Sequence, residues 1–191
     1  MSDRFFVITG GPGSGKSTLI AALAETGLAT MPEAGRAIIR GQQAIGGSAL
    51  PWADRAAFAE LMLGWELRSH AEAHAHPGPV LFDRGVPDVI GYLSLCGFAV
   101  PLHMHRAARR YRYNPTIFLA PFWAEIYATD TERRQSAAEA EATAAAMVRT
   151  YEASGYRIAT LPRGPVKERA AFVRAEIAGA MAAVATNSGE W

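Results

Sequence analysis

Residues 7–23 read VITGGPGSGKSTLIAAL, and this stretch decides the fold of the chain. The β-branched and aromatic segment Arg4–Thr9 predicts a strand. A helix is expected over Lys16–Glu25. Between the strand and the helix, residues 10–17 match G-x-x-x-x-G-K-[ST], the pattern of a phosphate-binding loop (P-loop).

Each residue type in this loop suits the binding of a nucleoside triphosphate. Glycines allow backbone N–H groups to converge on phosphate oxygens, and the helix directs its positive end at the same anion. Lys16 is expected to reach the β- and γ-phosphates, and the Ser17 hydroxyl is expected to ligate Mg²⁺. The predicted nucleotide-binding set is Gly10, Gly11, Pro12, Gly13, Ser14, Gly15, Lys16, Ser17 and Thr18. A glycine-rich turn that arose by chance is the alternative, and the flanking strand and helix argue against it.

The rest of the chain alternates short apolar strands with longer helices. Further strands are predicted at residues 28–32, 79–83, 116–122 and 156–162, and further helices at 34–45, 52–75, 87–96, 101–112, 136–154 and 165–184. This alternation predicts an α/β fold with a parallel sheet and helices on both faces. One buried stripe is expected in the longest central helix, formed by Phe58, Leu61, Met62 and Trp65. We expect one domain over residues 1–184 and a flexible tail over 185–191.

Composition and charge narrow the class of protein. Half of the 191 residues are apolar and 19% are charged, which supports a packed core. The formal net charge is +1, so we expect neither a membrane nor a nucleic acid as partner. The single cysteine, Cys96, excludes an internal disulfide, and no apolar run reaches the length of a membrane span. We therefore expect a cytoplasmic protein with a small-molecule partner, and the oligomeric state is left open.

Asp83 ends a predicted strand at the edge of the sheet where ligands of parallel sheets bind. Mg²⁺ requires more oxygen ligands than Ser17 and two phosphates supply. Asp83 is therefore a candidate metal ligand through water, and also a candidate acceptor for the proton of an attacking hydroxyl. Its alternative role is a cap of the following helix, a role open to Asp88 as well.

Three other charged residues follow the second and third predicted strands. Glu33 is a candidate to deprotonate a substrate hydroxyl or to bind its sugar, and Arg36 follows one helical turn later. An exposed ion pair between these two residues is the alternative. Arg84 directly follows Asp83 and is a candidate contact for an acceptor phosphate or the β-phosphate, or else an ordinary surface charge.

Three classes of P-loop protein compete. A GTPase switch needs the strings N-K-x-D and D-x-x-G, and neither occurs. A ring-forming motor carries a helical domain beyond the fifth strand, whereas residues 163–191 supply only a helix and a tail. A small kinase fits the chain, with residues 121–135 as a lid that brings Arg133 and Arg134 to the transferring phosphoryl group. A solvated helix start is the alternative for that segment.

A basic segment, HRAARRYRYN at residues 105–114, offers a second type of function. One helical face is expected to carry Arg106, Arg109, Arg110 and Tyr113. An anionic acceptor or a nucleic acid would suit this face, although a solvated face with tyrosines packed inward is favoured. The second hypothesis is accordingly a nucleotide-binding switch with slow hydrolysis that docks to a partner through this face.

With the P-loop, four further segments carry a family resemblance: PEAGRAII, FDRGVPDVIGYL, RRYRYN and ERRQ. The chain resembles small bacterial AAA-labelled P-loop ATPases related to the NadR nicotinamide-riboside kinase domain, over nearly all of residues 1–180. The resemblance implies a three-layer P-loop NTPase fold of the nucleotide-kinase type. It also implies a five-stranded parallel sheet of order 2-3-1-4-5, with ATP and Mg²⁺ as cofactors.

The resemblance also implies roles for individual residues. Residues 10–17 correspond to the phosphate binder, the pair Asp83-Arg84 to the acid–arginine pair after the third strand, and Glu33 to the carboxylate after the second. The lid arginines and an arginine near the adenine correspond to Arg133, Arg134 and Arg163. Because some relatives bind GTP, the purine preference, the choice between hydrolysis and transfer, and the acceptor stay open.

Overall fold

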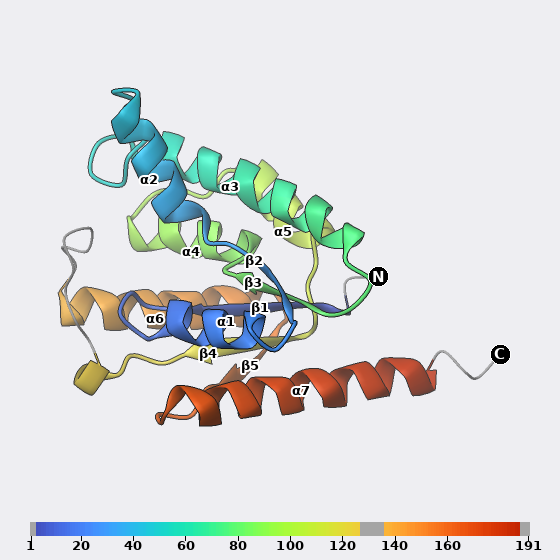
Figure 1. The fold of residues 1–191 in the computed structure, drawn as a ribbon. Helices are drawn as coiled ribbons and strands as arrows, with labels where there is room; N and C mark the ends of the chain where they lie inside the picture. Colours follow the sequence, from blue (N-terminus) through green and yellow to red (C-terminus); the bar gives the residue numbers. More distant parts are fainter. Residues whose placement is uncertain (1–2, 127–135, 188–191) are drawn as a thin grey trace.

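The computed structural model describes residues 3–126 and 136–187, and Figure 1 shows their arrangement. The strands are β1 (Phe5–Gly10), β2 (Ala29–Met31), β3 (Val80–Asp83), β4 (Thr116–Ala120) and β5 (Arg157–Thr160). The helices are α1 (Lys16–Ala24), α2 (Ala34–Ala44), α3 (Arg55–Glu72), α4 (Val86–Leu95), α5 (Leu102–Arg110), α6 (Ala137–Ala153) and α7 (Val166–Asn187). Two short 3₁₀ turns complete the set, η1 (Ala73–Ala75) and η2 (Ala124–Ile126).

The five strands form one parallel sheet of order β2-β3-β1-β4-β5. In the central strand, Val7 lies opposite Phe82 of β3 and Ile117 of β4. Every residue of β1, β3 and β4 is buried, as expected for strands covered on both faces. The α/β class and the strand order expected from the family resemblance are therefore confirmed.

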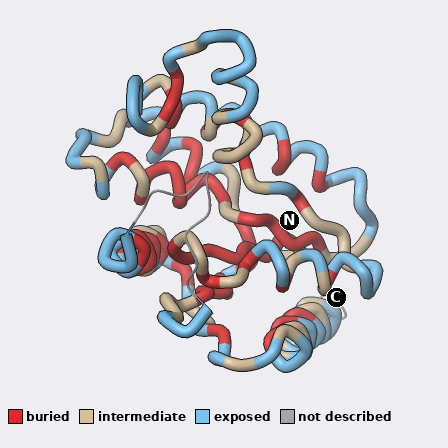
Figure 2. The backbone as a smooth tube through the Cα atoms, turned by 60° about the vertical axis from the view of Figure 1, so that its left-hand side comes forward, coloured by how far each residue is buried: buried red, intermediate tan, exposed pale blue. Residues whose placement is uncertain are grey.

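Helices cover both faces of the sheet. On one face, Phe6 and Ile8 of β1 pack with Leu19 of α1 and Val173 of α7. On the other face, β1 packs against Tyr151 of α6. The buried residues concentrate along the strands at the centre of the molecule (Figure 2). The result is a three-layer helix–sheet–helix arrangement.

Helices α2, α3, α4 and α5 lie together above the strands in Figure 1, whereas α7 runs along the opposite side. A separate apolar cluster joins α3, α4 and α5 through residues such as Leu63, Val89 and Met104. A smaller cluster joins α2 to α3 through Ile38 and Phe58. These helices therefore pack together next to the β2–β3 side of the sheet, where Asp83 ends β3 and Glu33 follows β2.

The buried stripe expected in α3 is partly wrong. Leu61 is 42% exposed and Trp65 is half-buried, because both side chains face the edge that α2 covers only partly. The buried face of α3 consists of Phe58, Ala59, Leu63, Glu66, Ser69 and His70. Apolar spacing did not reveal this face because half of these residues are polar or titratable.

None of the helices within residues 3–126 and 136–187 combines the length and the apolarity needed to cross a membrane.

The closing helix α7 continues to Asn187, past the boundary expected at residue 184. Of the expected lid, residues 121–126 are described, with η2 as their one short helical turn. The remaining lid residues, which include Arg133 and Arg134, lie outside the described part of the chain.

Candidate active site

The P-loop joins β1 to α1 and is packed between β4 and α6. A Cβ atom at Gly10 would lie 2.2 Å from the Ala120 carbonyl oxygen, and one at Gly11 would lie 2.2 Å from the Ala140 carbonyl oxygen. Gly15 has a left-handed backbone with φ of 73°. Glycine is therefore required at the first two positions by close contact with neighbouring backbone, in addition to the access to phosphate predicted from the motif.

Lys16 is buried in the loop, with 7% of its surface exposed. Its Nζ donates to the carbonyl oxygens of Gly10 (3.1 Å) and Gly11 (2.7 Å) and to the Ser14 hydroxyl (3.2 Å). Burial, together with repulsion from Arg84, lowers the pKa of Lys16 to about 7. The P-loop therefore holds the Lys16 side chain in place but disfavours its charged form. A bound anion would favour the charged form again.

Arg169 is a contact of the P-loop that nothing in the sequence marks. It extends from the first turn of α7, is 4% exposed, and donates from Nη2 to the Ser14 carbonyl oxygen at 3.0 Å. Its Nη1 would lie 2.7 Å from a Cβ atom at Gly15. Burial lowers its pKa. This guanidinium connects the last helix to the phosphate-binding loop.

Arg84 links the segments that follow β2 and β3. Its Nε donates to Glu33 Oε1 and its Nη1 to Asp88 Oδ1, both at 3.1 Å. The backbone at Arg84 is left-handed, with φ of 77°, a conformation that only tertiary contacts stabilise in a residue with a side chain. The Arg84 side chain is 18% exposed, so it is not the ordinary surface charge that was the alternative.

Asp88 is saturated with hydrogen bonds. Its Oδ1 accepts from the Thr9 hydroxyl at 2.5 Å as well as from Arg84, and its Oδ2 accepts from the Gly85 backbone N–H at 3.0 Å and the Tyr151 hydroxyl at 2.6 Å. These donors come from β1, the turn after β3 and α6. Asp88 is therefore the carboxylate at the start of α4, and it joins three layers of the fold.

Glu33 follows β2 and is an ionised member of this cluster. Burial would raise its pKa, but the nearby charges of Arg84 and Lys16 outweigh burial and lower it. Arg36 lies farther away, with its Nε 4.0 Å from Glu33 Oε2, so the ion pair predicted from spacing is secondary to the one with Arg84. Glu33 keeps 24% of its side chain exposed, and a ligand can therefore reach it.

Asp83, by contrast, has a buried carboxyl oxygen, Oδ1, that finds no hydrogen-bond partner among the described residues. Burial and the charge of Glu33 raise its pKa to about 6, although Lys16 and Arg84 act in the opposite direction. Asp83 does not cap α4, whose first turn is capped by Asp88. An unpartnered oxygen beside the P-loop is what a metal ligand would provide.

The donor set near the P-loop suits Mg²⁺ better than a metal held by protein alone. The hydroxyl of Ser17 is exposed, and Asp83 supplies one carboxylate. No cluster of three or more His, Cys, Asp or Glu side chains within residues 3–126 and 136–187 is arranged to hold a metal ion. Mg²⁺ characteristically keeps waters and phosphate oxygens as ligands, so two protein ligands are sufficient.

The remaining predicted residues lie around this centre. Arg163 follows β5 and donates from Nη2 to the Phe122 carbonyl oxygen at 3.1 Å, which joins the segments after β4 and β5 where the adenine is expected. On α5, Arg106, Arg109 and Arg110 are exposed, whereas Tyr113 lies beyond the helix and is buried. The expectation that Tyr113 shares one helical face with these arginines is therefore wrong, because α5 ends at Arg110 and Tyr113 turns into the core, whereas the favoured alternative of a solvated basic face with an inward tyrosine agrees with this arrangement.

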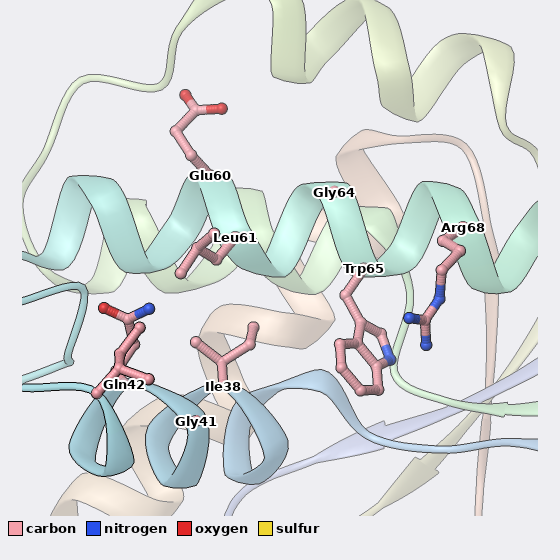
Figure 3. A pocket seen from close by; sticks show the side chains of 9 residues that line it. Ile38, Gly41, Gln42, Glu60, Leu61, Gly64, Trp65 and Arg68 are labelled. Carbon is pink, nitrogen blue, oxygen red and sulfur yellow. The ribbon is translucent and has the colours of Figure 1, made fainter. Parts of the chain in front are cut away.

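A groove of about 520 Å³ lies between α2 and α3 and is separate from this centre (Figure 3). Ile38 and Gln42 of α2 face Leu61 and Trp65 of α3 across it. No P-loop residue and no member of the Arg84 cluster lines it. The groove is therefore not where the charged residues converge.

A family described as AAA domain matches residues 5–169, most of the chain. The chain belongs to this AAA domain family. No curated protein matches it in sequence.

Solved structures of small-molecule kinases share the fold of this AAA domain. Deoxyadenosine kinase from M. mycoides, in a structure with the products dCMP and a flexible dCDP, is 12% identical with a TM-score of 0.63, over 92% of this chain and 99% of that chain. Shikimate kinase from Acinetobacter baumannii, in complex with shikimate, is 14% identical with a TM-score of 0.55, over 92% and 93% of the two chains. The AAA domain thus has the P-loop fold of nucleotide kinases.

Replacement of Arg84 by Ala tests the ion-paired cluster. It leaves the carboxylates of Glu33 and Asp88 without their cation, so we expect a loss of about 2–4 kcal/mol in the free energy of unfolding, measured in urea. The matched control is Arg68→Ala, which breaks an exposed pair with Glu72 and should lower stability by about 1 kcal/mol or less. Equal losses in the two variants would contradict the structural role assigned to Arg84.

Replacement of Asp83 by Asn tests the buried carboxyl. The folded chain holds the Asp83 proton up to about pH 6, whereas the unfolded chain releases it near 3.8, so wild-type stability falls as the pH rises between these values. We therefore expect Asp83→Asn to be more stable than wild type at pH 7, with the difference shrinking toward pH 4 in urea titrations. The exposed Glu141, replaced by Gln, controls for removal of one negative charge. A less stable Asp83→Asn variant at pH 7 would refute the assignment.

Proposed function

We propose that this protein is a magnesium-dependent kinase that transfers the γ-phosphoryl group of ATP to a hydroxyl of a small molecule. The observation that carries the proposal is the ion-paired cluster of Glu33, Arg84 and Asp88 beside the P-loop. A protein that only binds a nucleotide needs the P-loop and the metal site, but it does not need a further carboxylate beside them. The Glu33 carboxylate, fixed just after β2 and partly open to solvent, is suited to orient a second substrate.

Each charged group of the centre has a role in this proposal. Lys16 would exchange its loop carbonyl partners for phosphate oxygens and regain its charge. The ionised Glu33 would accept a hydrogen bond from the acceptor hydroxyl and direct its oxygen at the γ-phosphorus. Arg84 would hold Glu33 in place and stabilise negative charge that develops during transfer.

Ser17 and Asp83 would hold Mg²⁺, whose contribution is to neutralise and orient the phosphates. Although burial raises the pKa of Asp83 to about 6, its carboxyl is still mostly ionised at neutral pH, and it becomes protonated in acid, where it would no longer bind the metal. Arg133 and Arg134 would act from the lid on the transferring group. Arg163 would border the adenine.

The fold leaves the acceptor open, since kinases of this fold include one for a deoxynucleoside and one for shikimate. Kinship with the NadR nicotinamide-riboside kinase domain stays a prediction, as does the preference for ATP over GTP. A cytoplasmic location and the single-domain boundaries are likewise proposals.

One observation favours a second function. The side chains of Arg106, Arg109 and Arg110 on α5 are exposed, and no ion pair to an acidic residue within the described ranges engages them. Such a basic face suits an acidic partner, as a slowly hydrolysing switch would require. The nucleotide site would then control docking.

Turnover with a panel of hydroxyl compounds separates the two functions. Wild-type protein with Mg·ATP is incubated with unphosphorylated nucleosides, sugars and hydroxy acids, and products are identified by ³¹P NMR. We expect at least one compound to accelerate ADP formation and to appear as a phosphate monoester. Lys16→Ala should abolish this reaction, whereas Lys167→Ala, which removes the only other lysine of the sequence, should not.

Replacement of Glu33 by Gln should lower kcat for transfer by about 100-fold or more while the affinity for Mg·ATP stays nearly unchanged. Release of inorganic phosphate alone, at the same rate with every compound, would eliminate the kinase and leave the switch. Equal activity of wild type and Lys16→Ala would eliminate both.

A further inference from the structure

Arg169 is a buried cation that contacts the P-loop from outside the sequence motif. It lies in the first turn of α7 and is 4% exposed, and its Nη2 donates to the Ser14 carbonyl oxygen at 3.0 Å. Its Nη1 and the Cδ1 atom of Ile126 lie 2.7 and 3.2 Å from the position that a Cβ atom would occupy at Gly15. The guanidinium is therefore enclosed by the loop, α7 and the segment after β4.

The charge of Arg169 is not matched by an opposite charge. No carboxylate within residues 3–126 and 136–187 forms an ion pair with it. Its Nε is buried and has no hydrogen-bond partner within the same ranges. A buried charge without a counter-charge is unfavourable, and buried polar groups without partners are rare in native proteins. An anion bound at the P-loop would supply the missing negative charge.

The bond to Arg169 also fixes the direction of the peptide between Ser14 and Gly15. A planar trans peptide directs its C=O and its N–H to opposite sides, and the described chain contains no cis peptide. Because the Ser14 carbonyl faces Arg169, the Gly15 N–H points away from this arginine. That N–H forms no hydrogen bond with any group in the described part of the chain, so it is available to a ligand.

Ser14 connects Arg169 to the P-loop lysine. The Ser14 side chain is buried, and its hydroxyl donates to the Gly11 carbonyl oxygen at 2.9 Å and accepts from Lys16 Nζ at 3.2 Å. Two cations therefore bind one residue, Arg169 at its carbonyl and Lys16 at its hydroxyl. A shift of Ser14 would disturb both the lysine and the neighbouring amide.

We propose that Arg169 is a positioning residue of the nucleotide site. It holds the peptide between Ser14 and Gly15 so that the Gly15 N–H is directed at a phosphate group, and its buried charge strengthens phosphate binding. A nucleoside di- or triphosphate suits this arrangement, because loop amides, the start of a helix and a buried cation all favour negative charge. This assignment rests on the nucleotide binding of the proposed kinase and is independent of its acceptor.

The test compares Arg169→Met, which removes the charge and the donors, with Arg169→Lys, which keeps the charge. The matched control is Arg174→Met, which replaces an exposed arginine of the same helix. In calorimetric titrations we expect Arg169→Met to weaken the binding of Mg·ADP at least tenfold, Arg169→Lys to weaken it about threefold or less, and Arg174→Met to leave it unchanged. Wild-type affinity in a folded Arg169→Met variant, or an equal loss in Arg174→Met, would overturn the proposal.

A second measurement separates positioning of the amide from a purely structural role. The Gly15 amide resonance is followed by NMR while Mg·ADP is added. In wild type we expect the Gly15 amide proton to shift downfield as it donates to a phosphate, and in Arg169→Met we expect about half of this shift or less at saturation. A wild-type Gly15 amide that does not respond would overturn the role of Arg169, even if Arg169→Met fails to fold.

The same titrations distinguish this role from the proposed function. Absence of Mg·ADP binding by wild type would refute the nucleotide site, and the role of Arg169 with it. Absence of transfer to every hydroxyl compound, with the Gly15 response and the Arg169→Met loss as expected, would refute the kinase reaction alone and support the role of Arg169.

Discussion

The two bonds of the Arg84 guanidinium, to Glu33 and to Asp88, determine how the rest of the site is arranged. Glu33 ends the segment after β2, and Asp88 belongs to the first turn of α4. Asp88 in turn binds the Thr9 hydroxyl of β1 and the Tyr151 hydroxyl of α6. One cation thus fixes the segments after β2 and β3 relative to the strand that enters the P-loop. Because the Arg84 backbone is left-handed, these contacts must also outweigh its local strain.

In the free protein, Lys16 and Asp83 lie where they can bind a ligand that has both negative and positive parts, such as a polyphosphate with its divalent cation. Burial lowers the pKa of Lys16 to about 7 and raises that of Asp83 to about 6, so it disfavours the charged form of each group. A bound polyphosphate favours the charged form of the lysine, and a bound divalent cation favours the charged form of the aspartate. Charges that are already in position need little rearrangement when negative charge moves during phosphoryl transfer.

Local sequence patterns predicted much of this architecture. The P-loop motif, the apolar strand segments and the starts of the helices are local features of the sequence. Together with the strand order implied by the family resemblance, they were sufficient to predict the fold. The burial of Glu66 and of Arg169 could not be predicted in this way, because it depends on tertiary packing. The stripe in α3 was misplaced since a face with Glu66, Ser69 and His70 is not recognisable as buried from apolar spacing. Spacing also paired Glu33 with Arg36, whereas the fold brings the distant Arg84 closer.

The central claim is that the P-loop lysine, whose pKa burial lowers to about 7, takes up a proton at pH 8 when it binds a triphosphate. Calorimetric titration of Mg·ATP at pH 8, repeated in buffers of different ionisation enthalpy, measures both the affinity and the proton exchange. With the pKa of Lys16 at about 7, the account predicts tight binding with uptake of nearly one proton, and loss of both in Lys16→Ala. Equal binding by wild type and Lys16→Ala, without proton uptake in either, would contradict it.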